Sequence, residues 1–348
     1  MRSKKQRRLR GMVAAGLGAT ILGQAIMDNR RLAELRGQVV LIMGSSRGLG
    51  FELATQFADA GCRIAICARG AETLERARQA LQDRGVDVFA MPCDVSDLAQ
   101  VEAMIAATTQ HFGQIDILVN NAATITVGPL QTLGVADFEE AQHIIFWGMV
   151  YATLTVLPQM RERRSGRIVN VTSIGGKLSV PHLLPYSTAK AAAISFSEGL
   201  RAELAGTGIT VTTIVPGLMR TGAHVHATYA GDATGEYKWF TTGELAPLTA
   251  IHPSRAARAI LHATVRGSAE RILSFPAQLG ALVHGILPGF VTDLLGLVNR
   301  FGLPAAPQGW AEHVNGKALE GQAEGPLLHA LAQLNQPTAQ RLNQNGER

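Results

Sequence analysis

Short apolar runs alternate with longer segments of helical periodicity from residue 37 onward. The runs are rich in β-branched residues and apolar at consecutive positions, which is typical of parallel strands covered by helices on both faces. Seven strands are predicted, at Val39–Met43, Arg63–Ala68, Asp87–Met91, Ile115–Val119, Arg167–Val171, Thr210–Val215 and Arg271–Ser274. Six helices are predicted between them, at about Leu49–Ala60, Ala71–Arg84, Leu98–Phe112, Ala136–Met160, Tyr186–Ala205 and Pro253–Arg266. This order predicts an α/β fold, a single doubly wound parallel-sheet domain at residues 35–275.

Two apolar segments flank the predicted domain. Within residues 1–34, a basic tail precedes Gly11–Met27, a stretch of 17 residues without an ionisable side chain. Its length is at the lower limit for crossing a bilayer, so we expect an apolar helix at a membrane surface, with the domain on the cytoplasmic side. A spanning helix with a lumenal domain and a cleaved export signal are the alternatives.

The second apolar segment, residues 276–303, is interrupted by Pro288 and predicts a C-terminal extension of two short apolar helices. The remaining tail, residues 304–348, is polar and poor in large apolar side chains. We expect it to be loosely ordered.

The net charge of +5 originates in the N-terminal tail. Six of the first ten residues are Arg or Lys, whereas the rest of the chain has 26 basic and 27 acidic residues. Aromatic residues make up 5% of the chain, too few for a base-stacking surface, so no nucleic-acid partner is expected. The three cysteines and ten histidines do not follow a metal-binding spacing, and no metal site is expected.

A glycine-rich loop, Gly44–Gly50, follows the first predicted strand. Glycines at a strand-to-helix turn let the backbone approach a pyrophosphate, and the helix N-terminus supplies N–H donors, so the loop predicts a dinucleotide site. After the second strand the chain reads Cys67-Ala68-Arg69, without the acidic residue that binds the ribose 2′-hydroxyl of NAD. Arg69 and Arg47 are expected to pair with a 2′-phosphate, which favours NADP(H) over NAD(H). The alternative is that both arginines are solvated surface groups.

A hydroxyl, a phenol and an amine are predicted to lie near this loop. Tyr186 and Lys190 are four residues apart and share one helix face, where an ammonium would favour the phenolate. Ser173 follows the strand Arg167–Val171, at the carboxyl edge where parallel sheets bind ligands. The three groups together predict acid–base chemistry beside a dinucleotide.

These motifs, in this order, resemble the short-chain dehydrogenase/reductase family over residues 37–274. The resemblance implies a Rossmann-like fold, a homodimer or homotetramer, and hydride transfer between NADP(H) and a small-molecule carbonyl or alcohol. It implies that Tyr186 is the general acid or base, that Ser173 holds the substrate oxygen, and that Lys190 binds the nicotinamide ribose and lowers the tyrosine pKa. The expected cofactor-binding residues are Gly44, Ser45, Ser46, Arg47, Gly48, Leu49, Gly50, Arg69, Asp94, Val95, Asn121, Ala122, Tyr186, Lys190, Pro216, Gly217 and Thr221.

Three positions depart from the family pattern. Met43 replaces a threonine or serine, and Ala123 replaces a glycine, both conservatively. Ile145 stands where the family has an asparagine that helps to hold a proton-relay water. We therefore expect slowed activity, and the alternative function is a membrane-tethered NADP-binding scaffold or sensor with weak or no catalysis.

The segment at residues 218–252 is expected to form the substrate lid of this family. It contains Tyr229, Tyr237, Trp239 and Phe240. Aromatic side chains in a lid suit a sizeable apolar substrate such as a steroid, a retinoid or a lipid-derived carbonyl compound. The alternative is that they only anchor the loop.

Overall fold

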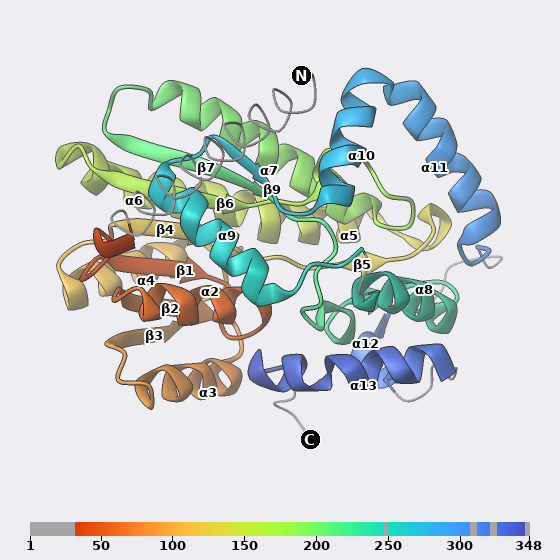
Figure 1. Cartoon of the computed structure of the whole chain (residues 1–348), viewed down its shortest axis with the longest axis horizontal. Coiled ribbons are helices and arrows are strands. Elements are labelled where there is room, and N and C mark those ends of the chain that lie inside the picture. Colours follow the sequence, from red (N-terminus) through yellow and green to blue (C-terminus); the bar gives the residue numbers. More distant parts are fainter. Residues whose placement is uncertain (1–31, 247–248, 307–311, 321–325, 345–348) are drawn as a thin grey trace, which may run out of the picture.

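Seven parallel strands form the central sheet of the computed structural model, in the order β3-β2-β1-β4-β6-β7-β9 (Figure 1). The structure describes residues 32–246, 249–306, 312–320 and 326–344. The strands are β1 Val39–Met43, β2 Arg63–Ala68, β3 Val88–Pro92, β4 Ile117–Asn120, β6 Gly166–Val171, β7 Ile209–Val215 and β9 Glu270–Ile272. The strand order reverses between β1 and β4, which is where doubly wound sheets bind ligands. The predicted α/β, Rossmann-like class is confirmed, and Gly11–Met27 lies outside the described residues.

Helices cover both faces of this sheet (Figure 1). One layer consists of α2 Gly48–Asp59, α3 Ala71–Gln82 and α9 Pro253–Arg266, and the other of α4 Leu98–Phe112, α6 Gly148–Glu162 and α7 Leu184–Glu203. All five residues of β1 are buried. Val39, Leu41 and Met43 contribute to the core under α4, α6 and α7, whereas Val40 and Ile42 contribute to the opposite core. The continuous apolarity of the strand thus reflects burial on both sides.

One predicted helix consists of three elements. The single helix expected over Ala136–Met160 is α5 (Val135–Ala141), a π-helical stretch (Gln142–Trp147) and α6. A π-helical turn changes the hydrogen-bond pattern by one residue without ending the helix, and such turns often lie at functional sites. The apolar spacing barely changes across it, so the periodicity did not reveal it. The other predicted elements differ from the structure by no more than two residues at an end.

Two apolar helices follow the sheet, as predicted: α10 (Phe275–Ile286) and α11 (Pro288–Gly302). They form a hairpin at the edge of the molecule (Figure 1), and α11 has no buried residue. Within the described ranges, no helix is both long enough and apolar enough to cross a membrane.

The described part of the C-terminal tail contains a strand and two helices, where the sequence led us to expect loose order. A short strand β10 (Val314–Asn315) pairs with β8 (Thr228–Tyr229), which pairs with β5 (Thr126–Val127) in a second sheet. The following helices are α12 (Gly316–Leu319) and α13 (Pro326–Arg341). Helix α13 packs against α8, which spans Ala233–Leu245. These tertiary contacts order a segment whose composition is too polar to form a core of its own.

Candidate active site

The carboxyl ends of four neighbouring strands line a cavity of about 530 Å³. Met43 of β1 pairs with Asn120 of β4, and Asn120 pairs with Asn170 of β6, so these strands end at nearly the same level. The residues that follow the strands therefore meet at one edge of the sheet. The segments after β1, β4, β6 and β7 contribute Gly44, Asn121, Ser173 and Pro216 to the cavity wall.

The loop between β1 and α2 is a backbone cradle. Gly44 has a φ of +75°, in the left-handed region, and a Cβ there would lie 2.7 Å from the Cα of Ala122. A Cβ on Gly50 would lie 2.2 Å from the carbonyl oxygen of Gly44. Asn121 Nδ2 donates to the same carbonyl at 2.7 Å. The loop leads into the N-terminus of α2, so this cradle fits the pyrophosphate of a dinucleotide.

Most of the predicted cofactor-binding residues line the cavity, and two do not. The side chain of Ser45 is fully buried, donating to Ile42 O at 2.7 Å and accepting from Cys67 N at 3.1 Å. It ties β1 to β2 instead of facing the cavity. Gly50 lies in the first turn of α2 against Gly44. The predicted cofactor-binding residues that line the cavity are Gly44, Ser46, Arg47, Gly48, Leu49, Arg69, Asp94, Val95, Asn121, Ala122, Tyr186, Lys190, Pro216, Gly217 and Thr221.

Two arginines lie at the cavity, Arg69 after β2 and Arg47 directly before α2, and the end of β2 carries no carboxylate. Cys67 is fully buried, with its Sγ 3.6 Å from the Sδ of Met43. The methionine that stands in place of the family's threonine or serine therefore packs in the core. Arg69 and Arg47 are exposed and line the cavity, as does Thr73 of α3. Two guanidinium groups at an open rim fit a 2′-phosphate.

The predicted phenol, amine and hydroxyl lie on the same wall. Tyr186 and Lys190 are one turn apart on α7, with the Lys190 ammonium nitrogen 5.7 Å from the centroid of the tyrosine ring. Lys190 is 2% exposed, and its Nζ donates to the carbonyl of Val171 at 2.8 Å. Ser173 Oγ accepts from Gly175 N at 3.0 Å, and the serine lies close enough to Tyr186 to work toward a lower pKa of its phenol. A substrate oxygen near the phenol would therefore also be near the serine.

Burial dominates the protonation of the phenol and the amine. Burial raises the pKa of Tyr186, and the hydrogen bond to Ser173 opposes this effect. Burial lowers the pKa of Lys190 to about 7. The lysine alone therefore does not produce the lowered tyrosine pKa expected from the i, i+4 spacing. A nearby negative charge would restore the ammonium form, because opposite charges favour ionisation.

The π-helical stretch Gln142–Trp147 carries the departure from the family pattern. Ile145 is 2% exposed and belongs to the core, and its neighbour Ile144 lines the cavity. An isoleucine side chain cannot hold a water molecule by hydrogen bonding. Any proton relay at this point would depend on the backbone.

The lid aromatics pack on one another. Tyr229, Tyr237 and Phe240 are buried in one cluster, where the ring centroids of Tyr229 and Tyr237 are 5.3 Å apart. Trp239 lies 5.8 Å from Phe240, ring to ring. None of these four side chains lines the cavity. Their packing agrees with the alternative that they anchor the segment at residues 218–252. Apolar lining is supplied by Ile125, Ile144 and Met219.

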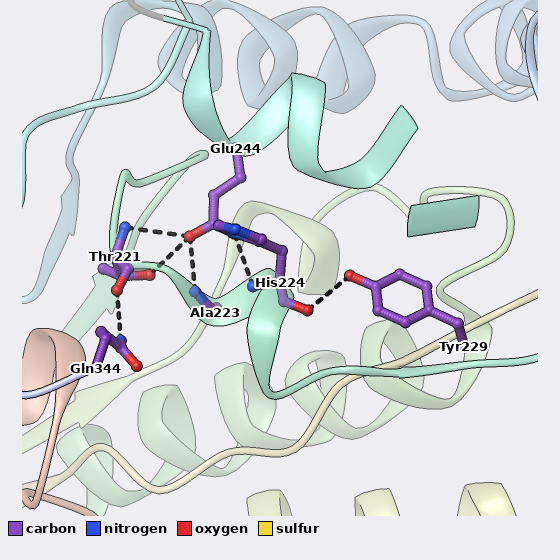
Figure 2. Close-up of polar contacts among 6 residues, drawn as sticks. All are labelled: Thr221, Ala223, His224, Tyr229, Glu244 and Gln344. Atoms are coloured by element: carbon purple, nitrogen blue, oxygen red, sulfur yellow. Dashed lines mark hydrogen bonds and ion pairs between the residues drawn. The ribbon is translucent and has the colours of Figure 1, made fainter. Parts of the chain in front are cut away.

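A buried carboxylate holds the segment after β7 (Figure 2). Glu244 of α8 accepts from Thr221 N and Oγ1 at 3.1 Å each, from Ala223 N at 2.8 Å, and from His224 N at 2.9 Å and Nδ1 at 2.8 Å. Burial works to raise the pKa of Glu244, but His224 and the backbone donors outweigh it and lower the pKa. The Thr221 hydroxyl uses its hydrogen in the bond that it donates to Glu244. Its oxygen can therefore only accept a hydrogen bond from a group in the cavity.

One wall of the cavity carries no signal in the sequence. Gln344, near the C-terminus, lines it and donates from Nε2 to the Thr221 carbonyl, a contact between residues 123 positions apart (Figure 2). Thr73 and His226 also line it. No motif marks these residues, since only the fold brings them to the strand ends.

The comparisons with known proteins agree with this architecture. The family model for short chain dehydrogenases matches residues 38–229. A dehydrogenase/reductase SDR family protein 7-like of Anopheles gambiae is 34% identical over 253 residues, 71% of this chain and 78% of that one. The fatty acyl-CoA reductase of Acinetobacter baylyi is 29% identical over 284 residues, 81% and 91% of the two chains. The crystal structure of a variant actinorhodin polyketide ketoreductase with NADPH has a TM-score of 0.60 at 30% identity, covering 69% and 95%.

The chain therefore belongs to the short-chain dehydrogenase/reductase family. It is an NAD(P)-dependent oxidoreductase that acts on CH–OH and C=O groups.

Proposed function

We propose that the protein is an NADP-dependent reductase or dehydrogenase with Tyr186 as its general acid and base. The observation that carries the proposal is that Tyr186, Ser173 and Lys190 share a cavity with the glycine cradle. When bound, the nicotinamide supplies or accepts the hydride. Tyr186 gives its proton to a carbonyl oxygen in reduction and takes it from a hydroxyl in oxidation, while Ser173 holds that oxygen. Lys190, kept charged by the anionic dinucleotide, binds the ribose hydroxyls and lowers the phenol pKa.

Thr221 supports the orientation of the nicotinamide end. Its hydroxyl oxygen can only accept a hydrogen bond, because its O–H already donates to Glu244. The amide nitrogen of a nicotinamide is a donor, so the two groups are complementary. Pro216 and Gly217, which also line the cavity, would lie on either side of this group.

The preference for NADP(H) is proposed from Arg47 and Arg69 at the rim. Replacing Arg69 by alanine is expected to lower kcat/KM with NADPH by roughly 10- to 100-fold, the value of a hydrogen bond to a charged group, and to leave NADH little changed. Arg84→Ala, at an exposed arginine beyond α3, is the matched control. Equal losses with the two cofactors would refute the preference.

A lipophilic substrate is proposed from the apolar lining at Ile125, Ile144 and Met219. The start of α10 adjoins Gly217, another residue of the cavity wall, because a Cβ on Gly217 would lie 2.6 Å from Ser274 Oγ and 3.2 Å from Ala277 Cβ. One relative acts, by its name, on fatty acyl-CoA. NADPH oxidation with steroids, retinal, aliphatic aldehydes and quinones tests the class, and turnover of only small polar carbonyl compounds would refute it.

Association with a membrane surface is proposed from two features. The hairpin exposes apolar side chains at i, i+4, i+7 and i+11 on each helix, a spacing that lies along one face. They are Phe275, Leu279, Leu282 and Ile286 on α10 and Phe290, Leu294, Leu297 and Phe301 on α11, each 48–75% exposed. The second feature is the predicted interfacial segment Gly11–Met27. We propose a lipid surface as the partner of both, with the catalytic domain on the cytoplasmic side.

Vesicle flotation tests this association. The full chain should float with phosphatidylcholine vesicles, and Leu282→Gln with Leu294→Gln should reduce the floated fraction. A double variant that floats as well as the wild type would show that the hairpin does not bind the vesicles.

Sedimentation equilibrium shows whether the chain is a homodimer or homotetramer. Protease accessibility in intact cells separates the cytoplasmic side from an exported or lumenal location.

A scaffold or sensor that binds NADP(H) with weak or no catalysis is the second candidate. The buried apolar Ile145 at the usual position of the relay asparagine favours it. Turnover of any carbonyl compound by the purified protein would exclude a scaffold without catalysis. Tight NADPH binding without turnover across the substrate panel would exclude the reductase.

A further inference from the structure

The last described residues of the chain are docked onto the start of α2. Leu342 is fully buried, and its carbonyl oxygen accepts from Gly48 N at 2.9 Å. Gly48 is the first residue of α2, so this N–H has no acceptor within the helix. The preceding Arg341 lies 2.6 Å from Ser254 Oγ and 3.3 Å from a Glu52 carboxylate oxygen. The end of α13 is therefore anchored next to the cofactor loop.

The next two residues join three segments of the cavity wall. Asn343 Nδ2 donates to the carbonyls of Ser46 at 2.7 Å and of Thr73 at 3.0 Å. Gln344 Nε2 donates to the carbonyl of Thr221 (Figure 2). These partners belong to the loop after β1, to α3 and to the segment after β7, and all three line the cavity. The chain end thus bridges the arginine rim and the segment that holds Thr221.

Gln344 is one of the residues that line the cavity. Its Oε1 is buried and, among the residues that the structure describes, has no hydrogen-bond partner. Buried acceptors are normally paired, and the ribose hydroxyls of a dinucleotide are donors. Gly222 leaves room for this side chain, because a Cβ there would lie 3.2 Å from Gln344 Cγ.

We propose that Leu342–Gln344, the C-terminal clasp, is part of the cofactor site and retains the bound dinucleotide. Gln344 is a further cofactor-binding residue, and Asn343 is a positioning residue that holds the loop after β1 against α3. The inference rests on the proposed binding of a nicotinamide dinucleotide in this cavity. Release requires the wall segments to separate, and the clasp bonds them together. The clasp therefore acts on the dissociation rate of the cofactor.

The test is the rate of NADPH dissociation from the full chain, followed by NADPH fluorescence in a stopped-flow experiment with excess NADP⁺ as competitor. Gln344→Ala and Asn343→Ala are each expected to dissociate NADPH roughly 3- to 10-fold faster, as for one lost hydrogen bond. A chain ending at Arg341 should dissociate it faster still. The association rate constant should not change. Gln340→Ala, at an exposed residue of α13, is the control and should match the wild type.

The dissociation rates of the variants support or overturn the clasp. The single variants retain Leu342 and Arg341, and a thermal melt checks that they are folded. Dissociation from Gln344→Ala at the wild-type rate would overturn the assignment, and tighter binding by the shortened chain would make the segment an inhibitor of cofactor binding. If the full chain binds NADH more tightly than NADPH, the proposed preference fails, and the same comparison with NADH still tests the clasp.

Discussion

The two walls of the cavity are built in different ways. The inner wall continues the strands, where Gly44, Asn121 and Ser173 follow β1, β4 and β6 and hydrogen-bonded register aligns the strand ends. The outer wall depends on side chains from α8 and the C-terminus, where Glu244 and Gln344 both bind Thr221. Substitutions in the inner wall should therefore alter chemistry and cofactor fit. Substitutions in the outer wall should alter cofactor retention and stability.

The largest effect is expected from Tyr186→Phe in the inner wall. Loss of a general acid typically costs 10²- to 10⁴-fold, so kcat should fall by roughly that factor while NADPH affinity is kept. The measurement is NADPH oxidation with an active carbonyl substrate, together with a fluorescence titration of NADPH. Tyr151→Phe, at a partly exposed tyrosine of α6, should behave as wild type. Unchanged turnover by Tyr186→Phe would remove the tyrosine from its proposed role.

The next effect is expected from Gly50→Ala, which places a Cβ 2.2 Å from the Gly44 carbonyl oxygen. Such overpacking costs about 1–3 kcal/mol, so the melting temperature should fall and the Kd for NADPH should rise roughly tenfold. Gly199→Ala in α7 is the matched control, since among the described residues no atom outside the neighbouring helix backbone lies within 4 Å of its added Cβ. The control should stabilise the protein by roughly 0.5–1 kcal/mol. Equal NADPH affinity in Gly50→Ala and wild type would contradict the proposal that the glycine cradle binds the dinucleotide.

The smallest effect on turnover is expected from Glu244→Gln in the outer wall. At neutral pH the variant should lose about 1–3 kcal/mol of unfolding free energy, because buried donors lose their charged acceptor. The pKa of Glu244 is lower in the folded protein than in the unfolded chain, so the carboxylate stabilises the fold above the unfolded value of about 4.3. This stabilisation is lost as the pH falls through the lower folded pKa.

Urea unfolding between neutral and acidic pH measures this difference. The free-energy gap between wild type and Glu244→Gln should be constant near neutral pH and should close in acid. Glu140→Gln, at an exposed glutamate of α5, should show no such gap. A gap that persists in acid would mean that the carboxylate charge does not stabilise this wall.

The inner wall could be predicted because its signals are local in the chain. Strands buried on both faces appear as continuous apolar runs, and Tyr186 and Lys190 are one turn apart on a helix. Adjacent strand ends then bring Ser173 to the same edge. The sequence did not reveal that the Ser45 side chain turns to β2, nor that a π-helical stretch interrupts the predicted helix, because neither changes the pattern of apolar residues.

The outer wall could not be predicted because its contacts are long-range and its residues are common polar types. Gln344 and Asn343 lie in a tail that composition alone suggests is loosely ordered. They are placed by the packing of α13, by the bond from Gly48 N to the preceding Leu342, and by their own bonds to Ser46 and Thr221. The lid aromatics show the same limit, since the sequence allows either substrate contact or anchoring and the packing favours anchoring.

The sequence by itself determined the parallel sheet, the glycine cradle and the position of Tyr186, Lys190 and Ser173 at one edge. Each depends on periodicity or on a spacing of a few residues, and hydrogen-bonded strands convert this local order into a shared edge. Only the tertiary structure decided what closes that edge. Whether the C-terminal tail covers the cofactor loop depends on side-chain contacts between residues hundreds of positions apart, such as Asn343 and Ser46, 297 positions apart.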